Sequence, residues 1–168
     1  MASPRYGTTR SIVPSRAGAC YGGAVGTDER STVPATVIDR LFVYGTLRSG
    51  QTARAVVAAH LVRGVSATTR GSLYAFPGDY PGVVPDDGGV IVGELLQLRD
   101  LPSALPLLDA FEGDEFLRLL TEVMTADGTT WAWMYVLASP ELARHGRRLE
   151  HGDWARHLAS APSDQDPK

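Results

Sequence analysis

The stretch Leu41-Phe42-Val43-Tyr44-Gly45-Thr46-Leu47-Arg48-Ser49-Gly50 organises the rest of the chain. A short apolar run that ends in a glycine and a hydroxyl residue is typical of a buried strand that passes into a loop. Consecutive amides of such a loop can bind a carboxylate or an oxyanion, because Gly45 carries no Cβ that would keep a ligand away. The same pattern occurs in purely structural turns, so spacing alone leaves both interpretations open.

Sites for phosphate and nucleic acid are disfavoured by sequence and composition together. The stretch contains neither a Gly-x-x-x-x-Gly-Lys-Ser/Thr loop nor a Gly-x-Gly-x-x-Gly fingerprint. The formal net charge is -3 and the pI is about 5.8, which leaves no excess of positive charge to neutralise phosphates. Of the 16 Lys and Arg residues only Lys168 is a lysine, and the arginines are scattered. We therefore expect no nucleic-acid partner.

The domain organisation follows from where apolar periodicity begins and ends. A chain of 168 residues fits one domain with a sizeable core. Residues 1–38 are rich in small polar residues and proline without a sustained period, which predicts a disordered N-terminal tail. Residues 39–158 are predicted to form the domain, and residues 159–168 a disordered C-terminal tail.

Cysteine content and hydropathy indicate the compartment. The single cysteine, Cys20, can form neither an internal disulfide nor a zinc site, which fits a reducing compartment. No apolar run approaches the roughly 18 residues that span a membrane. The expectation is a cytoplasmic protein without a membrane partner.

The first half of the domain is predicted to contain three strands and a helix. A strand from Arg40 to Tyr44 leads through a loop to a helix over about residues 52–62, which carries His60 as a packing or surface residue. Residues 65–76 predict a strand with a kink at Gly71, and residues 77–85 a rigid, irregular path. A turn over residues 86–89 then enters an apolar strand at residues 90–98. Within it, Glu94 is either a candidate acid or an outward-facing strand residue.

The second half begins with a helix that ends in a glutamate. Asp100 is placed to cap the helix, and Gly113 is a natural stop. Apolar residues at spacings of three and four predict its buried stripe: Leu101, Ala104, Leu105, Leu108 and Phe111. The helix C-terminus and the apolar flank are both expected to raise the pKa of Glu112. The residues alone leave open whether Glu112 is an acid/base or a solvated residue at a helix end.

A hairpin of two long strands is predicted to follow. The strands run over residues 115–125 and 130–137 and are joined by Ala126-Asp127-Gly128-Thr129. Trp131, Trp133 and Tyr135 share one strand face, which favours core or cross-strand packing. Residues 140–158 are helix-prone but polar.

Several short motifs in this order resemble the γ-glutamylcyclotransferase-like family, over about residues 41–157. The motifs are Val43-Tyr44-Gly45-Thr46-Leu47-Arg48-Ser49-Gly50, Tyr80-Pro81-Gly82-Val83-Val84, Val92-Gly93-Glu94-Leu95, Leu108-Asp109-Ala110-Phe111-Glu112-Gly113 and Gly152-Asp153-Trp154. The resemblance implies an α+β fold with a mixed, barrel-like β-sheet and flanking short helices. It also implies a cavity where the first loop meets the Glu112-Gly113 helix end. Many members carry Tyr-x-Arg after the Glu-Gly pair, whereas this chain has Phe116-Leu117-Arg118 and so lacks that hydroxyl.

The activity that the resemblance implies is cyclisation of a γ-glutamyl amide or γ-glutamyl amino acid to 5-oxoproline with release of an amine. Glu112 is then the catalytic acid/base, and the backbone of Tyr44 to Leu47 holds the γ-glutamyl group. The substrate-binding residues expected from the resemblance are Tyr44, Gly45, Thr46, Leu47, Tyr80, Pro81, Gly82, Arg118 and Tyr135. Asp109, one turn before Glu112, could share the cavity, but an exposed helix acid is the favoured interpretation. No cofactor and no metal are expected, and the protein is expected to be a monomer or weak dimer.

Two other functions are compatible with the sequence. A non-catalytic small-molecule binding protein could use the same cavity without turnover. An interaction module would instead present Trp131 and Trp133 on an exposed sheet face.

Overall fold

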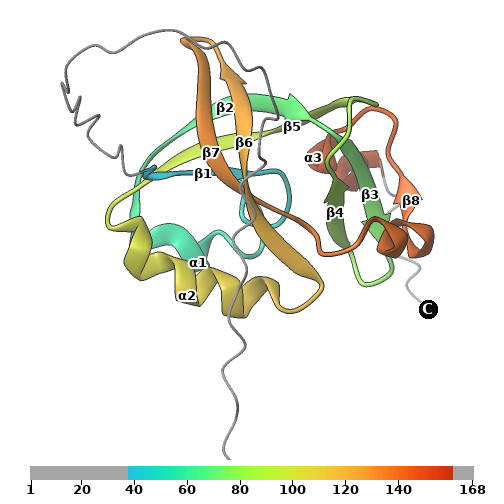
Figure 1. Cartoon of the computed structure of the whole chain (residues 1–168), viewed down its shortest axis with the longest axis horizontal. Coiled ribbons are helices and arrows are strands. Elements are labelled where there is room, and N and C mark those ends of the chain that lie inside the picture. The colour runs from blue at the N-terminus through green and yellow to red at the C-terminus, as the bar shows by residue number, and fades with distance from the viewer. Residues whose placement is uncertain (1–37, 161–168) are drawn as a thin grey trace, which may run out of the picture.

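The computed structural model describes residues 38–160, which form a five-stranded closed barrel beside a three-stranded sheet (Figure 1). The barrel strands, in order around the barrel, are β1 (Arg40–Val43), β5 (Val90–Leu98), β2 (Leu61–Arg70), β6 (Phe116–Thr125) and β7 (Gly128–Leu137). The small sheet has the order β4 (Tyr80–Val84), β3 (Ser72–Phe76) and β8 (Arg147–Arg148). The helices are α1 (Ala55–Ala58), α2 (Leu101–Glu112), the 3₁₀ helix η1 (Pro140–His145) and α3 (Trp154–Ser160). The predicted α+β class with a barrel-like sheet is confirmed.

The predicted tails fall almost entirely outside the described residues. Residues 1–37 and 161–168, including Cys20, are not described. Helix α3 continues to Ser160, two residues beyond the predicted end of the domain.

Strand β1 is apolar after Arg40 because both of its faces are buried from Leu41 to Val43. Phe42 belongs to a core cluster with side chains from the other barrel strands, such as Met134. Leu41 and Val43 point the other way and pack with α1 and α2, where Leu108 is one partner. Two buried faces explain the lack of alternation in this stretch, and they fix the position of the loop that follows it.

The predicted helix over residues 52–62 is wrong in its extent. Helix α1 covers only Ala55–Ala58, and β2 already begins at Leu61. From Leu61 to Arg70 the chain pairs with β5, beginning at Leu61↔Leu98. Ladder pairing with a distant strand therefore overrides the local helical pattern.

The predicted kinked strand is two strands of different sheets. The chain turns at Gly71, where φ is 149° and a Cβ would lie 2.8 Å from Ile91 Cδ1. Strand β2 stays in the barrel, while β3 enters the small sheet. The predicted irregular path also contains a strand, β4, in which Pro81 pairs with Ala75. Pro81 is compatible with pairing because β4 is an edge strand and needs no second ladder.

Helix α2 has the predicted limits but differs at both ends. Asp100 has a left-handed backbone (φ 52°) and its side chain caps no amide, so the predicted cap is wrong. The stripe of Leu101, Ala104 and Leu108 is buried. Phe111 is 44% exposed, so its predicted burial is also wrong. The predicted stop at Gly113 is confirmed, since its φ of 71° favours glycine and its N–H donates to the Asp109 carbonyl at 3.0 Å.

The predicted hairpin is confirmed with a tighter turn. Strands β6 and β7 pair from Phe116↔Leu137 to Thr125↔Gly128. The strand face that carries Trp131, Trp133 and Tyr135 passes from solvent into the core along β7. Trp131 is 54% exposed, whereas Tyr135 is buried. No helix within residues 38–160 is long and apolar enough to cross a membrane.

Candidate active site

A cavity of about 250 Å³ lies where the loop after β1 meets the C-terminal end of α2. Strand β1 brings the loop to one wall, α2 brings Glu112 to another, and the start of β4 contributes a third. The lining residues are Phe42, Val43, Tyr44, Gly45, Thr46, Leu47, Tyr80, Pro81, Phe111, Glu112, Glu115, Phe116 and Tyr135. The structure thus brings together segments that are up to about ninety residues apart in the chain.

Most of the residues expected from the sequence line this cavity. They are Glu112, Tyr44, Gly45, Thr46, Leu47, Tyr80, Pro81 and Tyr135. Gly82 and Arg118 do not line it. Sequence reasoning missed Phe42, Val43, Phe111, Glu115 and Phe116. Only their closeness in sequence to Tyr44 and Glu112 could have indicated them.

Gly82 and Arg118 have structural roles instead. A Cβ at Gly82 would lie 2.6 Å from Leu137 Cδ2 and 2.8 Å from Phe76 Cε2, so this glycine makes room for core packing. Arg118 forms an ion pair with Asp109, and its guanidinium lies 5.2 Å from the Trp133 ring centroid. The Arg118 guanidinium is therefore engaged by protein side chains and stands outside the cavity lining.

Asp109 is a partner within this polar cluster and not a freely exposed helix acid. Its Oδ1 accepts a hydrogen bond from the Tyr135 hydroxyl at 2.5 Å and also receives Arg118. The same Tyr135 hydroxyl oxygen accepts a hydrogen bond from the Arg118 guanidinium at 3.3 Å. These contacts fix the Tyr135 ring in the cavity wall, and burial raises the pKa of its phenol.

The Glu112 carboxyl is the group in the cavity whose pKa is shifted toward neutral pH. Burial raises its pKa from 4.5 to about 7. The direction agrees with the sequence-based expectation, and desolvation is the cause. A carboxyl with this pKa is present in both protonation states near neutral pH, so it can accept and return a proton.

Tyr44 provides a neutral wall beside this carboxyl. Burial, and secondarily the negative charge of Glu112, raise the pKa of the Tyr44 phenol well above its ordinary value. The hydroxyl donates to the Tyr135 carbonyl at 3.0 Å. Tyr44 therefore stays protonated and shapes the cavity without exchanging protons.

The loop presents backbone donors that the protein itself does not use. Within residues 38–160, no group accepts a hydrogen bond from the N–H of Gly45, Thr46 or Leu47. The next amide, that of Arg48, closes a turn onto the Gly45 carbonyl at 3.1 Å. Unused, consecutive amides in a cavity wall suit an anionic ligand.

Packing against Pro81 requires a glycine at position 45. A Cβ at this position would lie 2.4 Å from Pro81 Cγ. The sequence suggested that the missing side chain lets a ligand approach, whereas in the structure the same space receives the proline ring. This contact joins the loop to β4 across the cavity wall.

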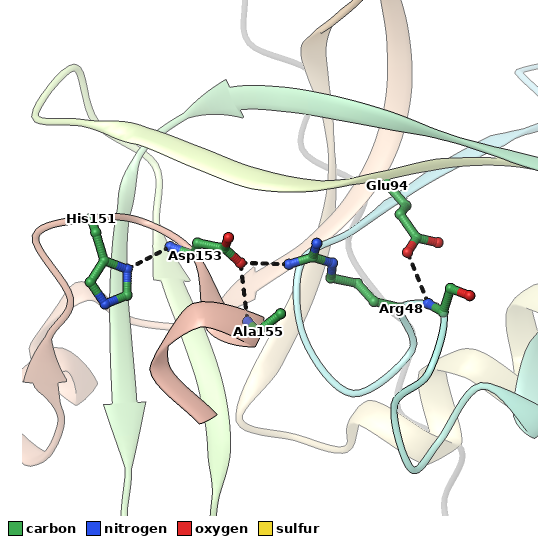
Figure 2. A network of polar contacts seen from close by, with 6 residues as sticks. Arg48, Glu94, His151, Asp153 and Ala155 are labelled. Atoms are coloured by element: carbon green, nitrogen blue, oxygen red, sulfur yellow. Dashed lines mark hydrogen bonds and ion pairs between the residues drawn. The ribbon is translucent and has the colours of Figure 1, made fainter. Parts of the chain in front are cut away.

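An ion pair and a hydrogen bond hold the loop from outside the cavity. Arg48 pairs with Asp153 at 2.8 Å, and Asp153 Oδ1 also accepts the N–H of Ala155 at 3.1 Å (Figure 2). On the other side, Glu94 Oε1 accepts the N–H of Ser49 at 2.9 Å (Figure 2).

Glu94 also supports the loop through a second residue. Its Oε2 pairs with Arg54 at 3.1 Å, and Arg54 in turn donates to the Leu47 carbonyl at 3.1 Å. The Glu94 side chain is only 16% exposed, so it is a partner of the loop and not an outward-facing strand residue.

No ligand set for a metal ion is evident in the part of the chain that is described. No group of three or more His, Cys, Asp or Glu side chains within residues 38–160 is arranged to hold a metal ion.

Residues 41–156 have the sequence of a cyclotransferase-type domain. A family model described as gamma-glutamyl cyclotransferase, AIG2-like, matches residues 41–156, and the chain belongs to this family. No curated protein sequence matches the chain.

Solved structures show the same fold. YkqA from Bacillus subtilis is 29% identical with a TM-score of 0.61, and the match covers 76% of this chain but only 43% of YkqA. An AIG2-like protein from Mus musculus is 20% identical with a TM-score of 0.57, over 78% of this chain and 97% of the mouse chain. The protein PH0828 from Pyrococcus horikoshii is 22% identical with a TM-score of 0.56, over 76% and 98%.

Proposed function

We propose that this protein is a γ-glutamyl cyclotransferase that converts a γ-glutamyl amide to 5-oxoproline and a free amine, with Glu112 as the acid/base. The observation that carries this proposal is the half-buried Glu112 carboxyl, with a pKa of about 7, in one cavity with the unused loop amides. Family membership supports the class of reaction.

The reaction needs orientation more than it needs a protein nucleophile. The substrate's α-amine attacks its own γ-carbonyl carbon, a five-membered lactam forms, and the bond to the leaving nitrogen breaks. Orientation of an intramolecular attack can contribute on the order of 7–11 kcal/mol. Tyr44, Pro81 and Tyr135 give the cavity rigid walls that can hold the folded substrate.

Proton transfer explains why the pKa of Glu112 matters. The substrate's α-ammonium has a pKa of about 8, so a carboxyl at 4.5 would accept its proton at a cost of about 5 kcal/mol. At about 7 the mismatch is roughly one unit, or about 1.4 kcal/mol. The protonated carboxyl then donates to the departing nitrogen as its bond to the γ-carbonyl carbon breaks, which restores the Glu112 carboxylate. The ring nitrogen loses its second proton to the released amine or to solvent, so that the products are the neutral lactam and the protonated amine.

The loop amides complete the arrangement. The N–H groups of Gly45, Thr46 and Leu47 would donate to the substrate's α-carboxylate or to the oxyanion that forms at the γ-carbonyl. Loss of one donor to such an oxyanion typically costs about 3 kcal/mol.

The test is release of 5-oxoproline from a panel of γ-glutamyl amides by the wild type and by Glu112→Gln. We expect wild-type turnover that falls at least about a hundredfold in the variant, with unchanged circular dichroism. Equal rates in both proteins would remove Glu112 from the reaction. If the wild type binds the compounds but releases no 5-oxoproline, the non-catalytic binding function takes the place of this proposal.

A further inference from the structure

The outer end of the cavity differs in character from the loop end. Four lining residues form what we call the cavity rim: Tyr80, Phe111, Glu115 and Phe116. Glu115 is exposed and Phe111 is 44% exposed, whereas Tyr80 and Phe116 are half-buried. A leaving amine must depart toward solvent, so the part of a substrate beyond the scissile bond meets this exposed end.

The rim is held in place by aromatic packing. The Tyr80 ring stacks on Phe76 with 5.2 Å between centroids and meets the Phe116 ring edge-on at 6.4 Å. The Tyr80 hydroxyl donates to Glu115 Oε2 at 3.2 Å. The other oxygen, Oε1, has no hydrogen-bond or ion-pair partner within residues 38–160. The carboxylate is thus oriented by one oxygen while the other is available to a ligand.

The charge of the lining has one sign. Glu112 and Glu115 are its ionisable carboxyl groups, and none of the described lining residues is Arg, Lys or His. Arg118 lies behind the wall, where Asp109 already neutralises it. A leaving group with a carboxylate would therefore meet no countercharge at the rim, while an ammonium group would meet a carboxylate and aromatic faces.

We propose that the rim is a subsite for a cationic leaving group, so that the preferred substrates are γ-glutamyl amides of alkyl diamines or of other amines with a second ammonium group. This inference rests on the proposed cyclotransferase function. Glu115 is the specificity-determining residue, since it can pair with the distal ammonium through Oε1. The rings of Phe111 and Phe116 add apolar and cation–π contact along the alkyl chain.

The experiment compares three γ-glutamyl amides that share one butyl spacer and end in an ammonium, a methyl or a carboxylate group. For the wild type we expect kcat/KM for the ammonium compound to exceed that for the methyl compound by about 5- to 30-fold, with the carboxylate compound lowest. Added salt should reduce this ratio, because the rim is exposed. In Glu115→Gln the ratio should fall toward one.

A matched control removes the same charge elsewhere. The Glu150 side chain is 80% exposed and does not line the cavity, so Glu150→Gln should keep the wild-type ratio. A wild-type preference for the methyl or carboxylate compound overturns the inference, as does a ratio that Glu115→Gln leaves unchanged. If no compound yields 5-oxoproline, the proposed function fails, and calorimetric binding of the same three compounds still decides the charge preference of the rim.

Discussion

Replacement of Gly45 by alanine places a Cβ 2.4 Å from Cγ and 3.1 Å from Cδ of Pro81. Carbon atoms in contact normally lie about 3.5–4.0 Å apart, so either the loop or the proline must move by about 1 Å. Pro81 is buried and paired with Ala75 in the small sheet, which limits its retreat. Overpacking of this kind costs about 1–3 kcal/mol, and we expect Gly45→Ala to lower the free energy of unfolding by that amount.

A double-mutant cycle isolates the contact. Pro81→Ala removes Cγ and Cδ and leaves only Cβ, which would lie at an ordinary 3.8 Å from the new methyl group. The double variant Gly45→Ala/Pro81→Ala should therefore be more stable than the sum of the single effects predicts, by about 1–3 kcal/mol. Gly50→Ala is the matched control, because it changes a glycine with φ 75° in the same loop and its Cβ would meet nothing within 4 Å. Its effect should add to that of Pro81→Ala.

The assay is urea-induced unfolding followed by tryptophan fluorescence. The slope with denaturant should be unchanged, so that differences in midpoint report stability. A loss below about 0.5 kcal/mol for Gly45→Ala, or simple additivity with Pro81→Ala, would refute the packing explanation of this glycine.

Two further predictions concern the carboxyl group and the loop. Between pH 4.5 and about 7 the folded protein binds the Glu112 proton more tightly than the unfolded chain does. As the pH rises through this window, the free energy of unfolding of the wild type should therefore fall by up to about 3 kcal/mol relative to that of Glu112→Gln. Urea unfolding at several pH values measures this difference. Equal pH profiles would contradict the raised pKa. Asp153→Asn removes the charge that holds Arg48 at 2.8 Å and should cost about 1–2 kcal/mol. If the loop amides bind the substrate's carboxylate, Asp153→Asn should also raise KM severalfold with little change in kcat. Asp87→Asn, at an exposed position, is the control and should leave KM unchanged. An unaltered KM for Asp153→Asn would refute the positioning role of this ion pair.

Local features could be predicted where neighbours in sequence decide the outcome. The hairpin of β6 and β7 and the stop at Gly113 depend on turn residues and on a single φ angle. The fate of residues 61–62 could not be predicted, because pairing of Leu61 with Leu98 outweighs the helical pattern of its neighbours. The exposure of Phe111 was missed for a related reason, since only the folded chain shows that the end of α2 forms the rim of a cavity.

The candidate site was partly accessible from sequence. Its motifs indicated Glu112 and the loop from Tyr44 to Leu47, and the structure places them around one cavity. The ordered short motifs also sufficed for the family, which the family model confirms. The position of Arg118 outside the cavity lining could not be predicted, because a strand arginine near a predicted site gives no sign that Asp109 will bind it.

The ordered motifs of the sequence indicate the family and, through that resemblance, the α+β class. Local periodicity adds the helix that ends in Glu112. Which residues support the loop and which line the rim depends on the folded chain. Arg48 and Asp153 are 105 residues apart, and Tyr80 and Glu115 are 35 apart. The physical reason is that burial, ion pairing and the raised pKa of Glu112 depend on distances in space, which arise only when the barrel closes and packs against α2 and β4.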